Sequence, residues 1–162
     1  MIGRSLRVEA SVGAQRDACG ERDVRATVRF VDAALGHRFA RLRITNESQR
    51  TCSVGGYPGV GALGDQGSIF HHAVEQREPL ADGDVTTQPI RLMPGAAAVL
   101  NLEWTGELAG AQSEWIRTLV IQLALGQGPL GISLNAPGDE QPWDIGIITT
   151  VNVGPWQSAA NS

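Results

Sequence analysis

The sequence contains no lysine, because all 13 of its basic residues are arginines. A chain without lysine has no side-chain amine for Schiff-base chemistry and no lysine for a phosphate-binding loop. It also lacks any run of about 20 apolar residues, so no membrane span is expected. The opening stretch, MIGRSLRVEASV, has no apolar core of the kind found in a signal peptide, although such a segment is removed from a mature exported protein.

The sequence also lacks the pattern of an amphipathic helix: no stretch of ten or more residues has apolar residues spaced three or four positions apart along one face. The chain has 162 residues, which fits one domain, and its 20 glycines and 8 prolines indicate many turns. Short alternating segments at regular spacing predict an all-β fold, an immunoglobulin-like antiparallel sandwich of seven to nine strands. We expect an N-terminal segment over 1–18 that adds an edge strand, a sandwich domain over 19–155 and a tail over 156–162.

The clearest alternation occurs in two neighbouring segments in the first third of the chain. Apolar residues from Val24 to Phe30, and again from Ala40 to Ile44, alternate with polar ones, which is the period-2 pattern of strands with one wet face. A hairpin joining them through residues 34–37 would gather four arginines on one surface. These are Arg25, Arg29, Arg41 and Arg43.

Weaker patterns predict further strands along the chain. The segment 98–104 should turn its even-numbered residues, Trp104 included, toward the core. The segment 115–125 is the most apolar and should be a central strand. Shorter strands are expected at 5–12, 69–74, 131–134 and 145–153, with an exposed connection over 75–88 and at most a helical turn over 106–114.

Only two cysteines are present, Cys19 and Cys52, separated by two predicted strands. One pair cannot provide the four ligands of a structural zinc site. We expect a disulfide that ties the N-terminal segment to the end of the second strand, and therefore an oxidising compartment. The alternative is two buried, reduced thiols in a cytosolic protein.

The cysteine lies in the most informative stretch of the chain, residues 45–60, which read TNESQRTCSVGGYPGV. Asn46-Glu47-Ser48 matches the acceptor pattern for N-glycosylation, but it also fits a polar turn, which we favour. Tyr57, Pro58 and Gly59 predict a structural bend. We expect the whole stretch to act as a structural clasp, with Tyr57 as a packing residue.

Motifs that suggest chemistry are weak in this sequence. Gly59, Gly61 and Gly64 form a G-x-G-x-x-G pattern without the following helix that a dinucleotide site needs. His71 and His72 are adjacent, so on a strand they would point to opposite faces. No serine or cysteine occurs in a nucleophile elbow. The acidic residues Asp139, Glu140 and Asp144 match no calcium loop and are expected in a solvated turn.

Two further features bear on binding. Trp143 and Trp156 flank prolines near turns and could be exposed for sugar stacking, although packing is the default interpretation. Residues 1–50 carry ten arginines and six acidic residues, a balance of +4, whereas residues 51–162 have a balance of -8. Such polarity marks a partner surface in some proteins and only solvated strand faces in others.

Several segments together resemble a family of bacterial domains of unknown function, number 4232. The resemblance rests on LGHRF at 35–39, on the stretch 45–60, on LMPGAAAVLNLEW at 92–104 and more loosely on DIGIITTVNVGP at 144–155, and it covers about residues 19–155. It implies an extracytoplasmic, exported or envelope-anchored sandwich in which Cys19 and Cys52 match the first cysteine pair of the family. The second pair that many members carry is missing here. The family has no established activity, so the resemblance implies no catalytic residue.

From these observations we expect a non-enzymatic binding or structural module of the bacterial cell envelope, without cofactor or metal. Its partner would be an envelope glycan or another surface protein, and no nucleic acid is expected. One alternative is an anion- or glycan-binding domain that uses the arginine-rich face, with a phosphorylated glycan or a lipid headgroup as ligand. Another is a hydrolase or metal-dependent enzyme centred on His71 or His72.

Overall fold

The computed structural model describes residues 6–34, 36–64, 69, 72–77, 89–105, 116–134, 145 and 149–159. Every regular element in these ranges is a β-strand. The strands are β1 (Leu6–Val8), β2 (Val24–Ala34), β3 (His37–Asn46), β4 (Cys52–Val54), β5 (Gly59–Gly64), β6 (Ala73–Gln76), β7 (Ile90–Leu92), β8 (Ala97–Thr105), β9 (Ile116–Gln122), β10 (Leu130–Ser133), β11 (Thr150–Val153) and β12 (Gln157–Ser158).

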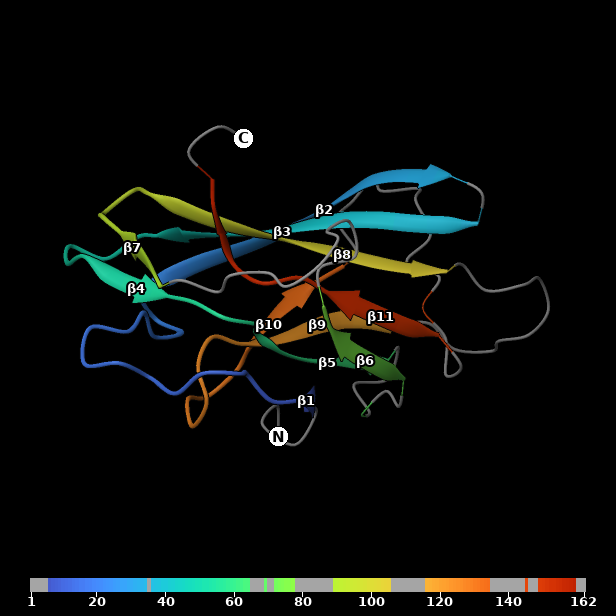
Figure 1. Cartoon of the computed structure of the whole chain (residues 1–162), viewed down its shortest axis with the longest axis horizontal. Coiled ribbons are helices and arrows are strands. Elements are labelled where there is room, and N and C mark those ends of the chain that lie inside the picture. The colour runs from blue at the N-terminus through green and yellow to red at the C-terminus, as the bar shows by residue number, and fades with distance from the viewer. Residues whose placement is uncertain are drawn as a thin grey trace.

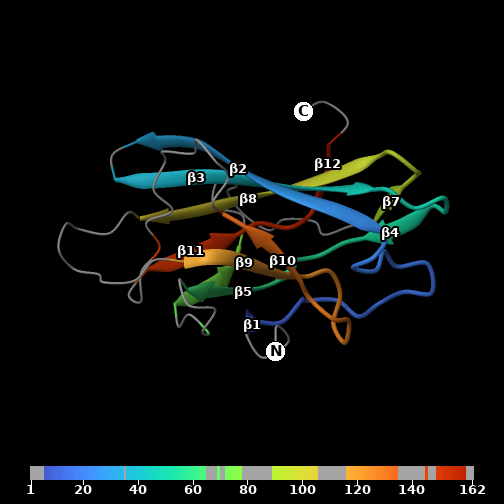
Figure 2. The same cartoon turned by 180° about the vertical axis from the view of Figure 1, so that it is seen from behind.

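The strands form two main layers with a small sheet at one end (Figures 1 and 2). One layer is a six-stranded sheet in the order β2-β3-β8-β11-β6, with β12 paired to β8. The other layer is a four-stranded sheet in the order β1-β5-β9-β10, and β4 pairs with β7 in the small sheet. The all-β class and the antiparallel sandwich arrangement are confirmed, whereas the immunoglobulin-like assignment stays a prediction.

The predicted hairpin is confirmed, because β2 and β3 pair along their whole length. The register runs from Val24 opposite Asn46 to Ala34 opposite His37, with an irregularity between Phe30 and Asp32. Gly36 occupies the connection with a positive φ of 85°, which glycine adopts without steric cost. Strand β8 then pairs with the other side of β3, from His37 opposite Thr105 to Thr45 opposite Ala97.

The core lies between the two layers and uses the predicted inward phases. The even-numbered residues of β8, Trp104 included, are buried, as are Leu42 and Ile44 of β3. Fully burying a side chain of this size is worth about 1.5–3 kcal/mol. A shift of one residue in the strand pairing would expose all of these side chains, so their burial determines the register. On the opposite layer, Leu119, Ile121 and Leu123 of the segment around β9 are buried, but Leu125 is 45% exposed because the strand already ends at Gln122.

Two features of the sheets differ from expectation. The described residues contain twelve strands rather than seven to nine, because β1, β4, β7 and β12 have only two or three residues each and are too short to produce an alternation. In addition, β11 pairs in parallel with β6, from Thr150 opposite Ala73 to Val153 opposite Gln76. A parallel pair needs a long crossover, and the four strands β7 to β10 lie between these two in sequence.

Both ends of the described chain join the sheets. Strand β1 pairs with β5 at the edge of the four-stranded sheet, and β12 pairs with β8. Trp156 is only 3% exposed, which agrees with the default packing interpretation and not with exposure for sugar stacking. Its backbone N–H donates to Gly56 O at 3.0 Å, which holds the segment after β11 against the core. Trp143 lies outside the described residues.

Candidate functional site

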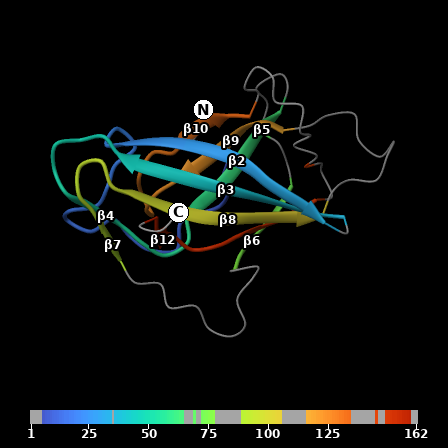
Figure 3. The same ribbon diagram turned by 90° about the horizontal axis from the view of Figure 1, so that it is seen from above.

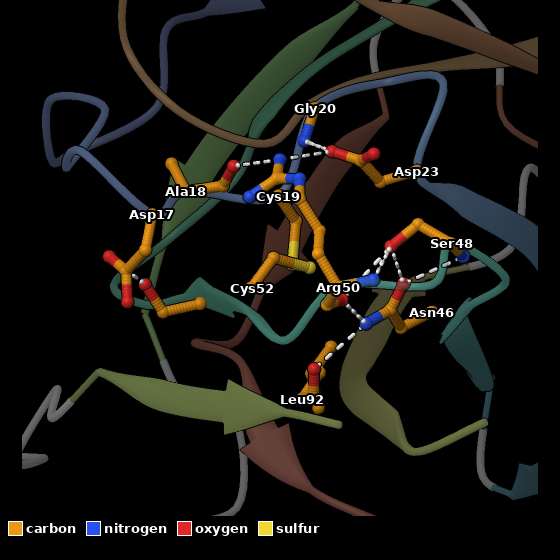
Figure 4. Close-up of polar contacts among 11 residues, drawn as sticks. Asp17, Ala18, Cys19, Gly20, Asp23, Asn46, Ser48, Arg50, Cys52 and Leu92 are labelled. Carbon is orange, nitrogen blue, oxygen red and sulfur yellow. Dashed lines mark hydrogen bonds and ion pairs between the residues drawn. A yellow bond between two sulfur atoms is a disulfide. The ribbon is translucent and has the colours of Figure 1, made fainter. Parts of the chain in front are cut away.

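The stretch 45–60 contains a covalent clasp (Figure 4). Cys19 and Cys52 form a disulfide whose Cα atoms are 4.8 Å apart, and both residues are buried. Around it, the backbone N–H of Cys19 donates to Ser53 O at 2.8 Å, and that of Ser53 donates to Asp17 O at 2.9 Å. The N-terminal segment is therefore tied to β4 by a disulfide and by backbone hydrogen bonds.

An ion pair extends the clasp to the start of β2. Arg50 Nη2 lies 2.6 Å from Asp23 Oδ2 and also donates to Ala18 O at 3.0 Å. The same carboxylate oxygen accepts the backbone N–H of Gly20 at 2.7 Å. The Arg50 side chain thus contacts Ala18 and Asp23, which lie on either side of the turn that precedes β2.

Asn46 is completely buried and uses both ends of its amide (Figure 4). Its Nδ2 donates to Arg50 O and Leu92 O, both at 2.8 Å. Its Oδ1 accepts the backbone N–H of Ser48 at 2.9 Å and the Ser48 hydroxyl at 2.7 Å. In the folded domain this nitrogen is occupied by hydrogen bonds, which supports the turn interpretation of Asn46-Glu47-Ser48 over glycosylation.

The bend at the end of the clasp lies at Gly56, immediately before the predicted bend at Tyr57, Pro58 and Gly59. Gly56 has a positive φ of 66°, while Gly59 is already the first residue of β5. Pro58 biases the preceding residue toward extended backbone, so the chain turns before Tyr57 rather than at it. Gly59, Gly61 and Gly64 all lie within β5, which excludes the strand-to-helix turn of a dinucleotide site at these glycines.

Gly59 is needed for close packing, and we predict that Gly59→Ala lowers the free energy of unfolding by about 2 kcal/mol. An added Cβ would lie 2.8 Å from both the backbone N of Ala10 and Oε1 of Gln122. These two atoms are themselves hydrogen-bonded at 2.9 Å, so the new methyl group would separate them. Urea denaturation measures the change. Gly13→Ala is the control, because no atom lies within 4 Å of its added Cβ; equal midpoints for the two variants would contradict the prediction.

A cavity of about 90 Å³ lies beside the disulfide. Residues from four separated segments line it, among them Val12, Ala18, Cys19, Val54, Pro89 and Leu123. Ligand sites are usually about 300–1,000 Å³. This cavity is therefore a packing gap next to the clasp and offers no room for a ligand of ordinary size.

Strands β2, β3 and β8 lie side by side in the six-stranded sheet (Figure 3), and its outer face carries the arginines that the alternation predicted on one surface. Arg29 of β2 lies directly opposite Arg41 of β3, and Thr27 lies opposite Arg43. Across β3, Arg43 lies opposite Val99 of β8. Residues opposite one another in an antiparallel sheet share a face with Cβ atoms about 5 Å apart, so these side chains form one patch.

The patch is hollowed, and we call it the arginine hollow. It has a volume of about 360 Å³ and is lined by Thr27, Arg29, Arg41, Arg43 and Val99. Arg29 and Arg43 are exposed and Arg41 is half-buried. Arg41 Nε donates to Asn101 Oδ1 at 3.4 Å, a long hydrogen bond. In the part of the chain that the structure describes, neither Arg29 nor Arg41 forms an ion pair with a carboxylate.

Arg25 is on the same face but not in the hollow. It precedes Arg29 by four residues, which is about 13 Å along a strand. Its side chain is 73% exposed and lies 4.0 Å from Glu47 Oε1, a surface ion pair worth little. The four predicted arginines therefore divide into three that line the hollow and one beside it.

Comparison with known families identifies the chain. A model of the family described as "Domain of unknown function (DUF4232)" matches residues 19–157, which is most of the sequence. The chain belongs to the DUF4232 family. The comparisons with curated proteins and with solved structures gave no match.

The histidines of this DUF4232 domain do not form a cluster in its described part. His72 is only 3% exposed, and its backbone O accepts a hydrogen bond from Arg7 Nε at 3.0 Å. Among the residues with described placement, no group of three His, Cys, Asp or Glu side chains could hold a metal ion, and no helix is long and apolar enough to cross a membrane. His71, Asp139, Glu140 and Asp144 lie outside the described residues.

Sequence reasoning missed two parts of the outer face of the DUF4232 domain. Val99, 7% exposed, lines the hollow, although only a long-range pairing could bring it beside Arg43. Further along β8, Glu103 is buried and lies 2.6 Å from His37 Nδ1, while its other oxygen accepts from Asn152 Nδ2 at 2.5 Å. The outward phase of β8 marked Glu103 as a residue of this face, but nothing local indicated its partners on β3 and β11.

Proposed function

We propose that this domain is a non-enzymatic, extracytoplasmic binding module of the bacterial envelope that recognises a phosphate-bearing ligand at the arginine hollow. A phosphorylated glycan and a lipid headgroup are the two sources of that chemistry. The observation that carries the proposal is the hollow itself, in which Arg29, Arg41 and Arg43 surround one space.

Electrostatics favours an anion in this space. Like charges directly opposite each other across two strands destabilise a sheet, and Arg29 faces Arg41 in this way. An anion between the guanidinium groups would convert that repulsion into attraction. Arginine suits the task because its planar fork of N–H donors matches phosphate and carboxylate oxygens in pairs.

Size and shape agree with a small group or one unit of a polymer. The volume of about 360 Å³ lies in the range of about 300–1,000 Å³ that is usual for ligand sites. Thr27 adds a hydroxyl that can donate to a phosphate oxygen, and Val99 adds an apolar surface against which a sugar or glycerol carbon can pack.

Two observations support an extracytoplasmic location. Disulfides persist in oxidising compartments and are rare in the cytosol, and Cys19 and Cys52 are joined by one. The family resemblance described above also implies export. The buried disulfide stabilises a small domain, and the exposed hollow leaves room for a ligand. Both features suit a module at the cell surface.

We predict that Arg29→Ala with Arg41→Ala weakens binding of linear polyphosphate at least tenfold at 50 mM NaCl. Each lost arginine removes a charge-assisted contact, and the dependence of log K on log salt should become shallower by roughly 1–2 units. Titration calorimetry of the folded domain at 50 and 200 mM NaCl measures both effects. A parallel arm with vesicles containing an anionic phospholipid separates a lipid headgroup from a soluble phosphate ligand.

The matched control is Arg16→Ala with Arg77→Ala, which removes the same charge elsewhere. Both side chains belong to exposed residues; Arg16 lies in the segment before Cys19, and Arg77 follows β6 at the opposite edge of the sheet from β2. Equal losses in the two double variants would show an effect of net charge rather than a site. No binding to polyphosphate or to anionic vesicles at low salt would refute the proposal.

The enzyme alternative stays a prediction centred on His71 or His72. The buried position of His72 does not favour it, because a catalytic imidazole must reach its substrate. The polyanion proposal has the stronger observation behind it, because three arginines line one hollow.

A further inference from the structure

Strand β2 lies at the end of the six-stranded sheet, and its outer edge pairs with no strand in the part of the chain that the structure describes (Figure 3). It has 11 residues, which makes it the longest strand among those described. In an antiparallel sheet, alternate residues of an edge strand direct their backbone N–H and C=O groups away from the sheet. Such an edge is a template for another extended segment.

The core side of this edge is incompletely covered. Val24, Ala26 and Val28 face the core but are only half-buried, whereas their neighbours on β3, Leu42 and Ile44, are completely buried. Across the sandwich, β10 is the edge of the four-stranded sheet, and it contacts β2. Its Leu130 is also only partly buried. A strand added beside β2 would therefore cover apolar surface at this margin.

The solvent side of the same edge is basic. Arg25, Thr27 and Arg29 alternate with the three apolar residues and are all exposed. A residue opposite Arg25 and one opposite Arg29 are four positions apart on an added strand, and they lie on the same face. Acidic side chains at those two positions would complement both arginines.

A second copy of the chain fits this edge poorly. Two β2 strands paired antiparallel about Thr27 would place Arg25 of one copy opposite Arg29 of the other, and like charges at such positions are destabilising. Basic residues on an edge are a common protection against self-pairing. The irregularity between Phe30 and Asp32 limits the regular part of the edge to residues 24–29.

We propose that residues 24–29 of β2 bind an extended segment of a partner protein by strand addition. The segment carries two acidic residues four positions apart, with apolar β-branched residues at the positions between them that face the core. This inference goes beyond the proposed function, because it depends on the edge of the sheet and not on the arginine hollow. Thr27 and Arg29 belong to both surfaces, and Arg29 is the charged residue that they share.

The test uses the full chain and a fluorescent peptide with Glu-Val-Thr-Val-Glu at its centre, followed by anisotropy. Two further peptides carry N-methyl groups on alternate backbone amides. One is methylated at the odd-numbered positions and the other at the even-numbered positions. Strand addition uses only one phase of the peptide amides, so one N-methyl peptide should bind at least tenfold more weakly than the parent while the other stays within about threefold. Purely ionic binding predicts no difference between the phases.

A charge exchange tests the register. Arg25→Glu with Arg29→Glu should weaken binding of the parent peptide at least about tenfold and strengthen binding of a peptide with Lys at both acidic positions. Arg16→Ala with Arg77→Ala is the control and should leave the parent peptide within about twofold. Polyphosphate titration of the wild-type chain reports the hollow separately, so that either proposal can fail alone.

Three results would overturn the inference. One is equal binding by a peptide of the same composition with its two Glu residues adjacent. Another is equal binding by both N-methyl phases. The third is a dimer in sedimentation equilibrium that the peptide dissociates, since it would assign the edge to a second copy.

Discussion

Replacing both Cys19 and Cys52 by alanine is expected to lower the free energy of unfolding by about 4 kcal/mol. The disulfide closes a loop with a sequence separation of 33 residues, and the open chain gains the conformational freedom that this loop restricts. For a domain of this size the loss corresponds to a fall in Tm of roughly 8–16 °C. Urea denaturation and thermal melting, both followed by circular dichroism, measure the two quantities.

A matched comparison separates the loop effect from packing. The wild-type protein unfolded in the presence of a reducing agent should show most of the same loss, because reduction removes the crosslink but keeps the sulfur atoms. Amide exchange at Cys19 and Ser53 should also become faster, since their hydrogen bonds join the two segments that the disulfide holds. Identical denaturation midpoints for the oxidised and reduced protein would contradict the assignment of the disulfide as the main constraint of the clasp.

Asn46→Ala is expected to lower the free energy of unfolding by about 3 kcal/mol. The side chain is completely buried and makes four hydrogen bonds at 2.7–2.9 Å. Its loss leaves the buried Leu92 O without this donor and Ser48 N without its acceptor, whereas Arg50 O keeps the Ser48 hydroxyl as a donor. Each buried group left unsatisfied costs about 1–3 kcal/mol. Chemical denaturation with a constant m-value is the appropriate measurement.

Two further variants locate the cause. Ser48→Ala removes a hydroxyl that donates to Asn46 Oδ1 and Arg50 O and accepts from Arg50 N, all near the surface. It leaves both donations from Asn46 Nδ2, so the expected loss is about 1 kcal/mol. Asn46→Asp keeps the acceptor for Ser48 and places a second oxygen where the amide donated to two carbonyls, so it should be at least as destabilising as alanine. A stability of Asn46→Ala equal to that of Ser48→Ala would show that the contact with Leu92 contributes little.

The two proposed ligands are expected to compete, because Arg29 lines the hollow and also belongs to the edge of β2. A bound phosphate and an acidic strand would both draw on this guanidinium. Saturating polyphosphate should therefore weaken binding of the acidic peptide in the wild-type protein. The domain would then exchange a phosphate-bearing ligand for a protein partner at one face.

The strands with long alternation, and the face that each presents, could be predicted from the sequence alone. The β2-β3 hairpin follows from local pattern, so the positions of Arg29, Arg41 and Arg43 on one surface could be predicted. The same holds for the inward residues of β8, including Trp104. Local periodicity is sufficient here because consecutive strands with a short connection pair with each other, and burial then fixes the register.

The features that depend on distant segments could not be predicted without the three-dimensional fold. The parallel pairing of β6 with β11, the burial of Trp156 and the donation from Asn46 to Leu92 each join residues far apart in sequence. Val99 reaches Arg43 only because β8 pairs with β3. Strands of two or three residues carry no periodicity of their own, and their places are set by the backbone partners and the core that the rest of the fold provides. The arginines were therefore visible in the sequence, while the hollow that they line was created by packing.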